Sequence, residues 1–256
     1  MRLFLLFGFL LSVFSASPAL ASFERGKLAY DQKNWRVAIG YLRPLAEQGD
    51  AKAQIILGNM YAQGYGVVRD PAEAYKLYRK AALQNHAEAM VIVGAMHQQG
   101  IGTQKSTLRA LEWYKRAADS GHPGGAYFYG LYMFRGNKSK VGNDIKPDLA
   151  LAYRWFRITE RTAKDDKLKE SAKILAEKLT ALLSAEQLAA ENEKAAAWLP
   201  VKLEQLGQAP PEKEDLPPEP APGLLPPPEA PPESPAENTS GATDQSGPTA
   251  DDSQKP

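Results

Sequence analysis

Residues 50–86 read DAKAQIILGNMYAQGYGVVRDPAEAYKLYRKAALQNH, and residues 86–122 read HAEAMVIVGAMHQQGIGTQKSTLRALEWYKRAADSGH. The two segments repeat with a period of 36 residues, which aligns Gly58, Gly64, Gly66 and Ala74 with Gly94, Gly100, Gly102 and Ala110. A fixed period of this length is typical of stacked supersecondary units, each too small to bury its own apolar face. The sequence therefore predicts a fold built from contacts between neighbouring units.

Each unit reads as a helix, a glycine turn and a second helix. In the first full unit, one helix is expected over about residues 51–63, and two glycines then supply the positive backbone angles of a tight turn. The second helix begins at Asp70, whose side chain can accept hydrogen bonds from the first amides, with Pro71 where no amide hydrogen is needed. Glu73 stands at the position that closes a capping box.

The ends of the second helices extend the repeat in both directions. Gly49, Asn85 and Gly121 fall 36 residues apart, where a glycine or asparagine adopts the left-handed conformation at low cost. A truncated first unit is therefore expected over about residues 23–49.

The last unit starts near Pro123 and matches the repeat at Gly130, Gly136, Asp148 and Ala152. Six residues are inserted in its turn, around NKSKVGNDIKP. Such an insertion is either neutral lengthening of a loop or a functional loop on a binding face.

The first helix of the last unit is apolar almost all round, with the sequence AYFYGLYMF. It must therefore be covered on two sides or leave an apolar patch exposed. The expected cover follows in the chain as a pair of helices. The first has an apolar stripe made of Leu168, Ala172, Leu175, Leu179 and Leu182. The second starts at Ser184, with Gln187 at the capping-box position, and stops before Pro200.

The two ends of the chain differ from this middle part. Arg2, an apolar run over residues 3–14, and Ala19 and Ala21 form the pattern of a secretory signal peptide cleaved after residue 21. The run is too short to span a bilayer, so no stable membrane insertion is expected after cleavage. Residues 207–256 are rich in proline and acidic residues, which predicts a disordered tail with local polyproline II character.

Charge and cysteine content limit the class of protein. Residues 22–206 carry 28 Lys and Arg against 20 Asp and Glu, whereas residues 207–256 carry 2 against 10. The chain has no cysteine, so an exported form depends on packing without disulfides. The basic residues of the second helices form either a binding stripe or a solvated face, and export argues against a nucleic-acid partner.

The repeat closely resembles the Sel-one-like repeat (SLR), a relative of the tetratricopeptide repeat, over about residues 23–160. The matching positions are Ala53, Leu57, Gly58, Tyr61, Gly64, Gly66, Val67, Asp70, Ala74, Tyr78, Lys80, Ala81 and Ala82. The second unit departs from the pattern at His97, Thr103 and Ser106. The resemblance implies an α/α superhelical scaffold that binds proteins or peptides, and exported bacterial members are associated with envelope signalling, assembly or host contact.

The expected architecture is an all-α solenoid of about four helix-turn-helix repeats. The domains are a signal peptide at 1–21, the repeat array at 22–160, capping helices at 161–206 and the tail at 207–256. Helical stepping from Gly58 places five partner-binding candidates on one side of the first helices: Asn59, Gln63, Gln98, Gln99 and Arg135.

Two functions follow from these features. The first is a non-catalytic scaffold of the bacterial envelope, periplasmic or alternatively secreted, that binds a protein or peptide in a groove and needs no cofactor or metal. The second is a cell-wall-active enzyme, penicillin-binding or β-lactamase-like, as claimed for some relatives. No serine stands in a Ser-x-x-Lys arrangement, and His86, His97 and His122 lack metal spacing, so no catalytic, cofactor or metal residue is assigned. The sequence leaves the partner and the oligomeric state open.

Overall fold

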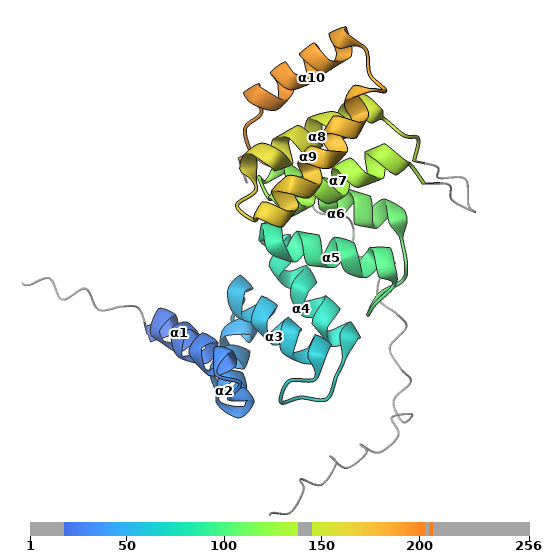
Figure 1. Cartoon of the computed structure of the whole chain (residues 1–256). Helices are drawn as coiled ribbons and strands as arrows, with labels where there is room; N and C mark the ends of the chain where they lie inside the picture. Colours follow the sequence, from blue (N-terminus) through green and yellow to red (C-terminus); the bar gives the residue numbers. More distant parts are fainter. Residues whose placement is uncertain (1–17, 138–144, 203–204, 207–256) are drawn as a thin grey trace, which may run out of the picture. The chain divides into compact units, whose positions relative to one another are not determined.

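The computed structural model describes residues 18–137, 145–202 and 205–206, and this part of the chain is helical (Figure 1). Its helices are α1 (Pro18–Asp31), α2 (Trp35–Glu47), α3 (Ala51–Gln63), α4 (Pro71–Leu83), α5 (Ala87–Gln99), α6 (Thr107–Asp119), α7 (Pro123–Arg135), α8 (Leu149–Thr162), α9 (Asp166–Thr180) and α10 (Ala185–Ala197). An isolated antiparallel bridge between Asn137 and Ile145 closes the base of the last turn.

The helices pack in pairs, and each pair packs on the next. From α1 to α8, every helix contacts the helix that follows it in the chain, and α10 contacts α8. The buried apolar residues accordingly form three consecutive clusters along the array instead of one central core. The predicted all-α solenoid is therefore confirmed, because each unit completes its apolar face against its neighbours.

The starts of the second helices follow the predicted capping chemistry with one change. Asp70 Oδ1 accepts hydrogen bonds from the amides of Ala72 and Glu73, each at 3.0 Å. The expected capping box does not form at Asp70, because the Asp70 amide donates to the carbonyl oxygen of Tyr61 at 2.9 Å. Glu73 Oε2 lies 3.5 Å from Lys76 Nζ instead.

The turns hold each unit against the one before it. In the units 51–86 and 87–122, the second turn glycine lies on the start of the preceding second helix. A Cβ at Gly102 would stand 2.0 Å from the carbonyl oxygen of Pro71, and one at Gly66 would stand 2.5 Å from the Cβ of Trp35. Both glycines have positive φ, 67° and 69°, so these positions require glycine for two independent reasons. The predicted left-handed residues Gly49, Asn85 and Gly121 also have positive φ.

The capping helices form, but they cover a different helix from the one expected. Ser184 and Gln187 make the predicted capping box at the start of α10. However, α9 and α10 pack mainly against α8, whereas α7 lies between α6 and α8. The apolar stripe of α9 ends at Leu179, since Leu182 lies beyond the helix and is 62% exposed. Part of the apolar surface of α7 is therefore left without a covering helix.

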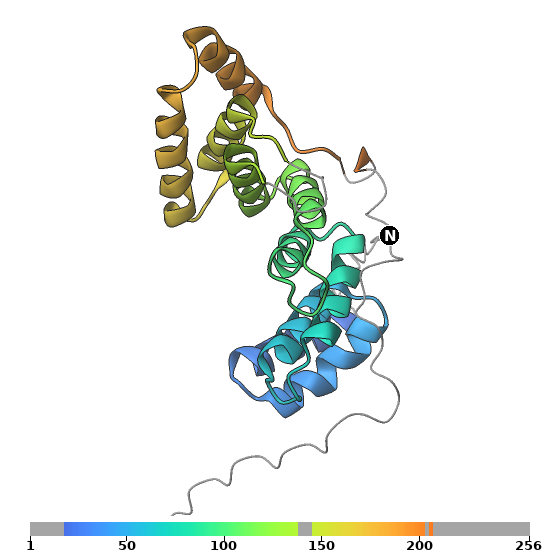
Figure 2. The same cartoon turned by 90° about the vertical axis from the view of Figure 1, so that its right-hand side faces the viewer.

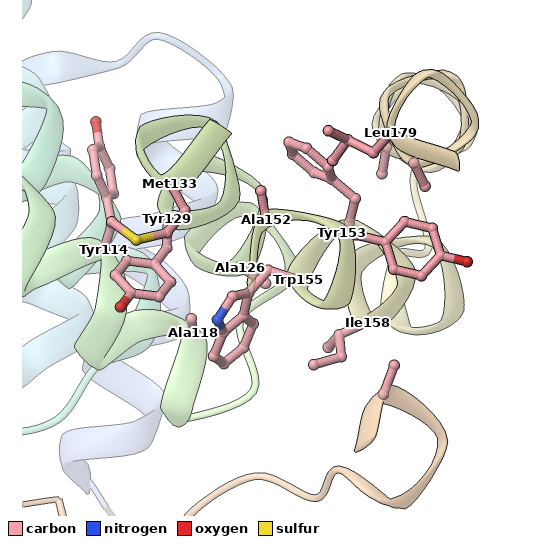
Figure 3. Packing of buried hydrophobic residues seen from close by; sticks show 14 of the residues in the cluster. Tyr114, Ala118, Ala126, Tyr129, Met133, Ala152, Tyr153, Trp155, Ile158 and Leu179 are labelled. Carbon is pink, nitrogen blue, oxygen red and sulfur yellow. The ribbon is translucent and has the colours of Figure 1, made fainter. Parts of the chain in front are cut away.

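The cluster around α8 is dominated by aromatic rings. Figure 3 shows Tyr129 of α7 beside Trp155 of α8, and the two rings meet edge to face at 5.6 Å. Trp155 also meets Trp198, which follows α10, at 5.8 Å. Tyr153 of α8 points the other way, and its hydroxyl donates to Asn192 Oδ1 of α10 at 3.0 Å.

The chain after α10 runs back along the array as an extended segment (Figure 2). The amide of Val201 donates to the carbonyl oxygen of Asp119 at 2.7 Å. Pro200 lies over Gly121, where a Cβ would stand 2.9 Å from the Pro200 Cγ. Arg161 holds the end of α10 through hydrogen bonds of 2.7 Å to the carbonyl oxygens of Ala196 and Trp198.

Three sequence predictions fall outside the described residues. They are the apolar run of the signal peptide, the centre of the six-residue insertion and the acidic tail. Residues 18–21, at the end of the expected signal peptide, form the first turn of α1. Among the described helices, none combines the length and the hydropathy needed to cross a membrane.

Candidate partner-binding site

A pocket lies between successive first helices, at the edge of α7 that the capping helices leave uncovered. It encloses about 470 Å³, and we call it the α5–α7 pocket. Its walls come from the end of α5, the turn into α6, and α7 with the residues that follow it. The lining residues are Gln98, Lys105, Thr107, Phe128, Leu131, Tyr132, Arg135, Gly136 and Asn137.

The floor of the pocket is a set of fixed aromatic rings. Tyr114 of α6 stacks on Phe128 with ring centroids 4.9 Å apart and planes at 24°, and it meets Tyr132 at 5.9 Å. The Tyr114 hydroxyl donates to Gln98 Oε1 at 2.8 Å, which ties the floor to the end of α5. Because Tyr114 is fully buried, the rings of Phe128 and Tyr132 pack against a side chain that close packing holds in place.

Two unpaired cations accompany this floor. Lys105 and Arg135 are exposed, and neither makes a hydrogen bond or an ion pair to any residue in the described ranges. The stripe on the second helices is different: Lys115 pairs with Asp119 at 2.7 Å, and Arg157 pairs with Glu160 at 2.5 Å. The stripe is thus largely satisfied within the protein, whereas the cations of the pocket remain available to a ligand.

The phenols of the pocket are held neutral. Burial raises the pKa of Tyr132, and burial first and the nearby Tyr132 second raise the pKa of Tyr114. Both hydroxyl groups therefore keep their hydrogen at neutral pH and act as donors. Among the described residues, the lining includes no carboxylate, histidine or cysteine, so its chemistry is apolar contact, hydrogen bonding and attraction of negative charge.

Comparison with known proteins agrees with this architecture. The Sel1 repeat family matches residues 51–86, 87–122 and 123–158. A Sel1 repeat protein from Oxalobacter formigenes, known from its crystal structure, is 32% identical over 70% of this chain and 73% of its own, with a TM-score of 0.55. The chain belongs to the Sel1 repeat family.

A second solved structure is more distant from this Sel1 repeat protein. It is a protective antigen present in uropathogenic Escherichia coli strains and displaying an SLR fold, 19% identical over 69% of this chain and 44% of its own, with a TM-score of 0.45. No curated protein sequence matches the chain. The truncated first unit predicted over residues 23–49 lies outside the matched repeats, and α1 and α2 form its helix pair.

The five partner-binding candidates in this Sel1 repeat protein have different surroundings. Gln98 and Arg135 line the α5–α7 pocket together. Asn59 is half-buried and accepts a hydrogen bond of 2.6 Å from the Tyr78 hydroxyl, so its side chain serves the packing of α3 on α4. Gln63 and Gln99 are exposed at the ends of α3 and α5, at the same repeat position as Arg135, and they do not line the pocket.

Sequence reasoning missed most of the pocket. Phe128, Leu131 and Tyr132 belong to the helix that is apolar almost all round, which was the available signal, but the capping helices were expected to cover it. Lys105 was missed because it lies in a turn, and helical stepping does not reach turn residues.

The histidines of this Sel1 repeat protein have structural positions. His97 is fully buried; its Nδ1 lies 3.4 Å from the carbonyl oxygen of Gln104, and its Nε2 lies 3.1 Å from the Tyr75 hydroxyl. His86 and His122 stand at the N-caps of α5 and α7. His122 Nδ1 accepts from the Gly125 amide at 3.3 Å, and burial lowers the pKa of His122. In the described ranges, no group of three or more His, Cys, Asp or Glu side chains is placed to hold a metal ion.

Proposed function

We propose that this Sel1 repeat protein is an exported scaffold of the bacterial envelope that binds a protein partner through the α5–α7 pocket. One observation carries the choice of surface: two cations without partners in the described structure accompany a rigid aromatic floor. Protein interfaces favour this combination, because aromatic and arginine side chains supply most of the binding energy at their centres.

Family membership supports the class of function. Sel1 repeat proteins generally mediate protein–protein interactions, and stacked repeats present an extended surface for such contacts. The signal-peptide pattern of residues 1–21 supports export, and the absence of cysteine suits either the periplasm or secretion. The partner is expected to be a protein or peptide.

A non-catalytic role is part of the proposal. A cell-wall-active enzyme needs a nucleophile with an activating base within hydrogen-bond reach. The α5–α7 pocket offers the hydroxyl groups of Thr107 and Tyr132, and within the described ranges no acidic or imidazole side chain lines it. The chemistry of this pocket supports binding over catalysis.

The test is photo-crosslinking in the native envelope, with a photoreactive amino acid in place of Leu131. Leu131 lines the pocket and is half-buried, and the matched control position is Lys80, exposed on α4. We expect a discrete protein adduct from position 131 and none from position 80. The adduct should disappear when Arg135→Glu is combined with the probe. An adduct from position 80 alone would contradict the proposed surface.

A further inference from the structure

We propose that the α5–α7 pocket recognises an acidic segment of its partner, in which an aromatic or aliphatic side chain is flanked by carboxylates. This inference rests on the proposed function and names the chemistry of the ligand. The apolar side chain would lie on Phe128 and Tyr132, and the carboxylates would pair with Lys105 and Arg135.

Charge complementarity is the first argument. In the described part of the lining, the charged residues are two cations, Lys105 and Arg135. They come from separate elements, Lys105 from the turn before α6 and Arg135 from the last turn of α7, so they present positive charge from more than one side. Thr107, the first residue of α6, also lines the pocket and brings the positive end of that helix to its edge. A basic segment would be repelled from this surface, whereas an acidic one is attracted.

Comparison of the repeats within the chain is the second argument. One period earlier, the positions of Phe128 and Tyr132 are occupied by Ile92 and Met96. The position of Lys105 is occupied there by Arg69, whose Nε donates to the carbonyl oxygen of Ala62 at 3.0 Å. In this earlier interface, Arg69 therefore stabilises the turn of its own repeat unit. The α5–α7 interface has a cation at the same place with no partner in the described residues, so repeat packing does not account for it.

The size of the pocket agrees with a short peptide anchor. Its volume of about 470 Å³ falls within the range of roughly 300–1,000 Å³ that is usual for ligand pockets. A large side chain placed on the rings gains apolar contact, and flanking carboxylates reach the exposed cations without full loss of water.

The test is selection from a random dodecapeptide phage library on the full-length protein, followed by affinity measurement with the selected peptides. We expect enrichment of Asp and Glu next to Phe, Tyr, Trp or Leu. The double variant Lys105→Glu/Arg135→Glu should lose about tenfold or more in affinity for the selected acidic peptides, because attraction becomes repulsion. The wild-type affinity should fall as salt rises.

The matched control is Lys80→Glu/Lys173→Glu, which makes the same change of net charge at exposed positions on α4 and α9. We expect it to keep the affinity within about twofold, because long-range attraction at exposed sites is screened. Equal losses in the two double variants would show a general charge effect and overturn the proposal.

Two further outcomes separate this inference from the proposed function. Peptides that lack acidic residues but lose binding in Leu131→Asp would keep the pocket as the site and overturn the ligand class. Peptides insensitive to Leu131→Asp and to the charge reversal, or no enrichment at all, would overturn both.

Discussion

The ring of Tyr114 occupies the space in which a side chain at position 94 would stand. A Cβ on Gly94 would lie 2.9 Å from Tyr114 Cε1, closer than carbon atoms pack. The same relationship recurs between Gly58 and Tyr78 at 2.8 Å, and between Gly130 and Phe156 at 3.0 Å. The repeat therefore conserves its helix spacing by pairing a glycine with an aromatic ring in every full unit.

Replacement of this glycine tests the relationship. Gly94→Ala should lower the free energy of unfolding by about 1–2 kcal/mol, because overpacking outweighs the gain of about 1 kcal/mol in helix propensity. The control is Gly40→Ala in α2, where a Cβ meets no atom within 4 Å. This control should be neutral or stabilising by up to about 1 kcal/mol. Chemical denaturation measures the free energy of unfolding of each variant. Equal effects of the two changes would show that the Tyr114 ring does not set the spacing between the two helices of the unit.

The buried phenol of Tyr114 predicts loss of stability at alkaline pH. Burial raises the pKa of Tyr114 above its ordinary value of 10.0. The folded state thus favours the neutral phenol. The contribution of Tyr114 to the free energy of unfolding is therefore complete below pH 10, and it is lost as pH rises through the pKa that Tyr114 has in the folded state. Tyr114→Phe should cost about 1 kcal/mol at pH 7 through the lost hydrogen bond to Gln98, and it should flatten the alkaline decline.

Denaturation series at pH 8 to 11 on wild type, Tyr114→Phe and Tyr65→Phe measure this effect. Tyr65 is an exposed tyrosine in the first glycine turn and serves as the control. If the free energy of unfolding of Tyr114→Phe declined with pH as steeply as that of the wild type, the alkaline loss of stability would not come from Tyr114.

Features fixed by local chemistry were predictable from the sequence. The helix start at Asp70, the left-handed positions at Gly49 and Asn85, and the capping box at Ser184 each depend on a few adjacent residues. The 36-residue period then places such features in equivalent units, so the fold class followed directly.

Features that depend on tertiary placement were not predictable in the same way. The choice of α8 as the helix that α9 and α10 cover depends on polar contacts such as Tyr153 with Asn192, which link residues far apart in the sequence. That choice leaves Phe128 and Tyr132 at a pocket surface. Helical stepping selected Gln98 and Arg135, which line this pocket, because they lie on helices; it did not reach Lys105, which lies in a turn. Asn59 was assigned to the binding face because a hydrogen bond to Tyr78 leaves no sequence signal.

The attachment of α10 predicts a loss of local stability in acid. The buried residues of α10 are Glu191, only 5% exposed, and Ala195. Burial alone would raise the pKa of Glu191, but hydrogen bonds from Arg154 and Lys194 outweigh it and lower the pKa. The stabilisation that Glu191 provides is therefore present above its ordinary pKa of 4.5, and it is lost as pH falls through the lower pKa that Glu191 has in the folded state.

Glu191→Ala should destabilise the docking of α10 by about 1–2 kcal/mol, because it leaves Arg154 partly buried without its carboxylate. Glu193→Ala, an exposed position on the same helix, is the control and should change little. Hydrogen exchange at pH 7 should show faster exchange of α10 amides in Glu191→Ala alone. Unchanged exchange in that variant would show that the ion pairs do not hold the helix.

The proposed export predicts a defined mature N-terminus. We expect cleavage between Ala21 and Ser22, with removal of the first turn of α1. N-terminal sequencing of the protein from its native host measures this directly. An intact Met1 on cytoplasmic protein would overturn both the localisation and the class of partner.

The most direct test of the account is hydrogen exchange on the full-length protein, with and without the partner captured by crosslinking at position 131. Binding in the α5–α7 pocket should slow exchange in residues 98–107 and 128–137, with little change in α4 and in the outer surface of α9. Protection confined to α4, α9 or residues 207–256, with residues 98–107 and 128–137 unchanged, would contradict the claim that the α5–α7 pocket is the binding site.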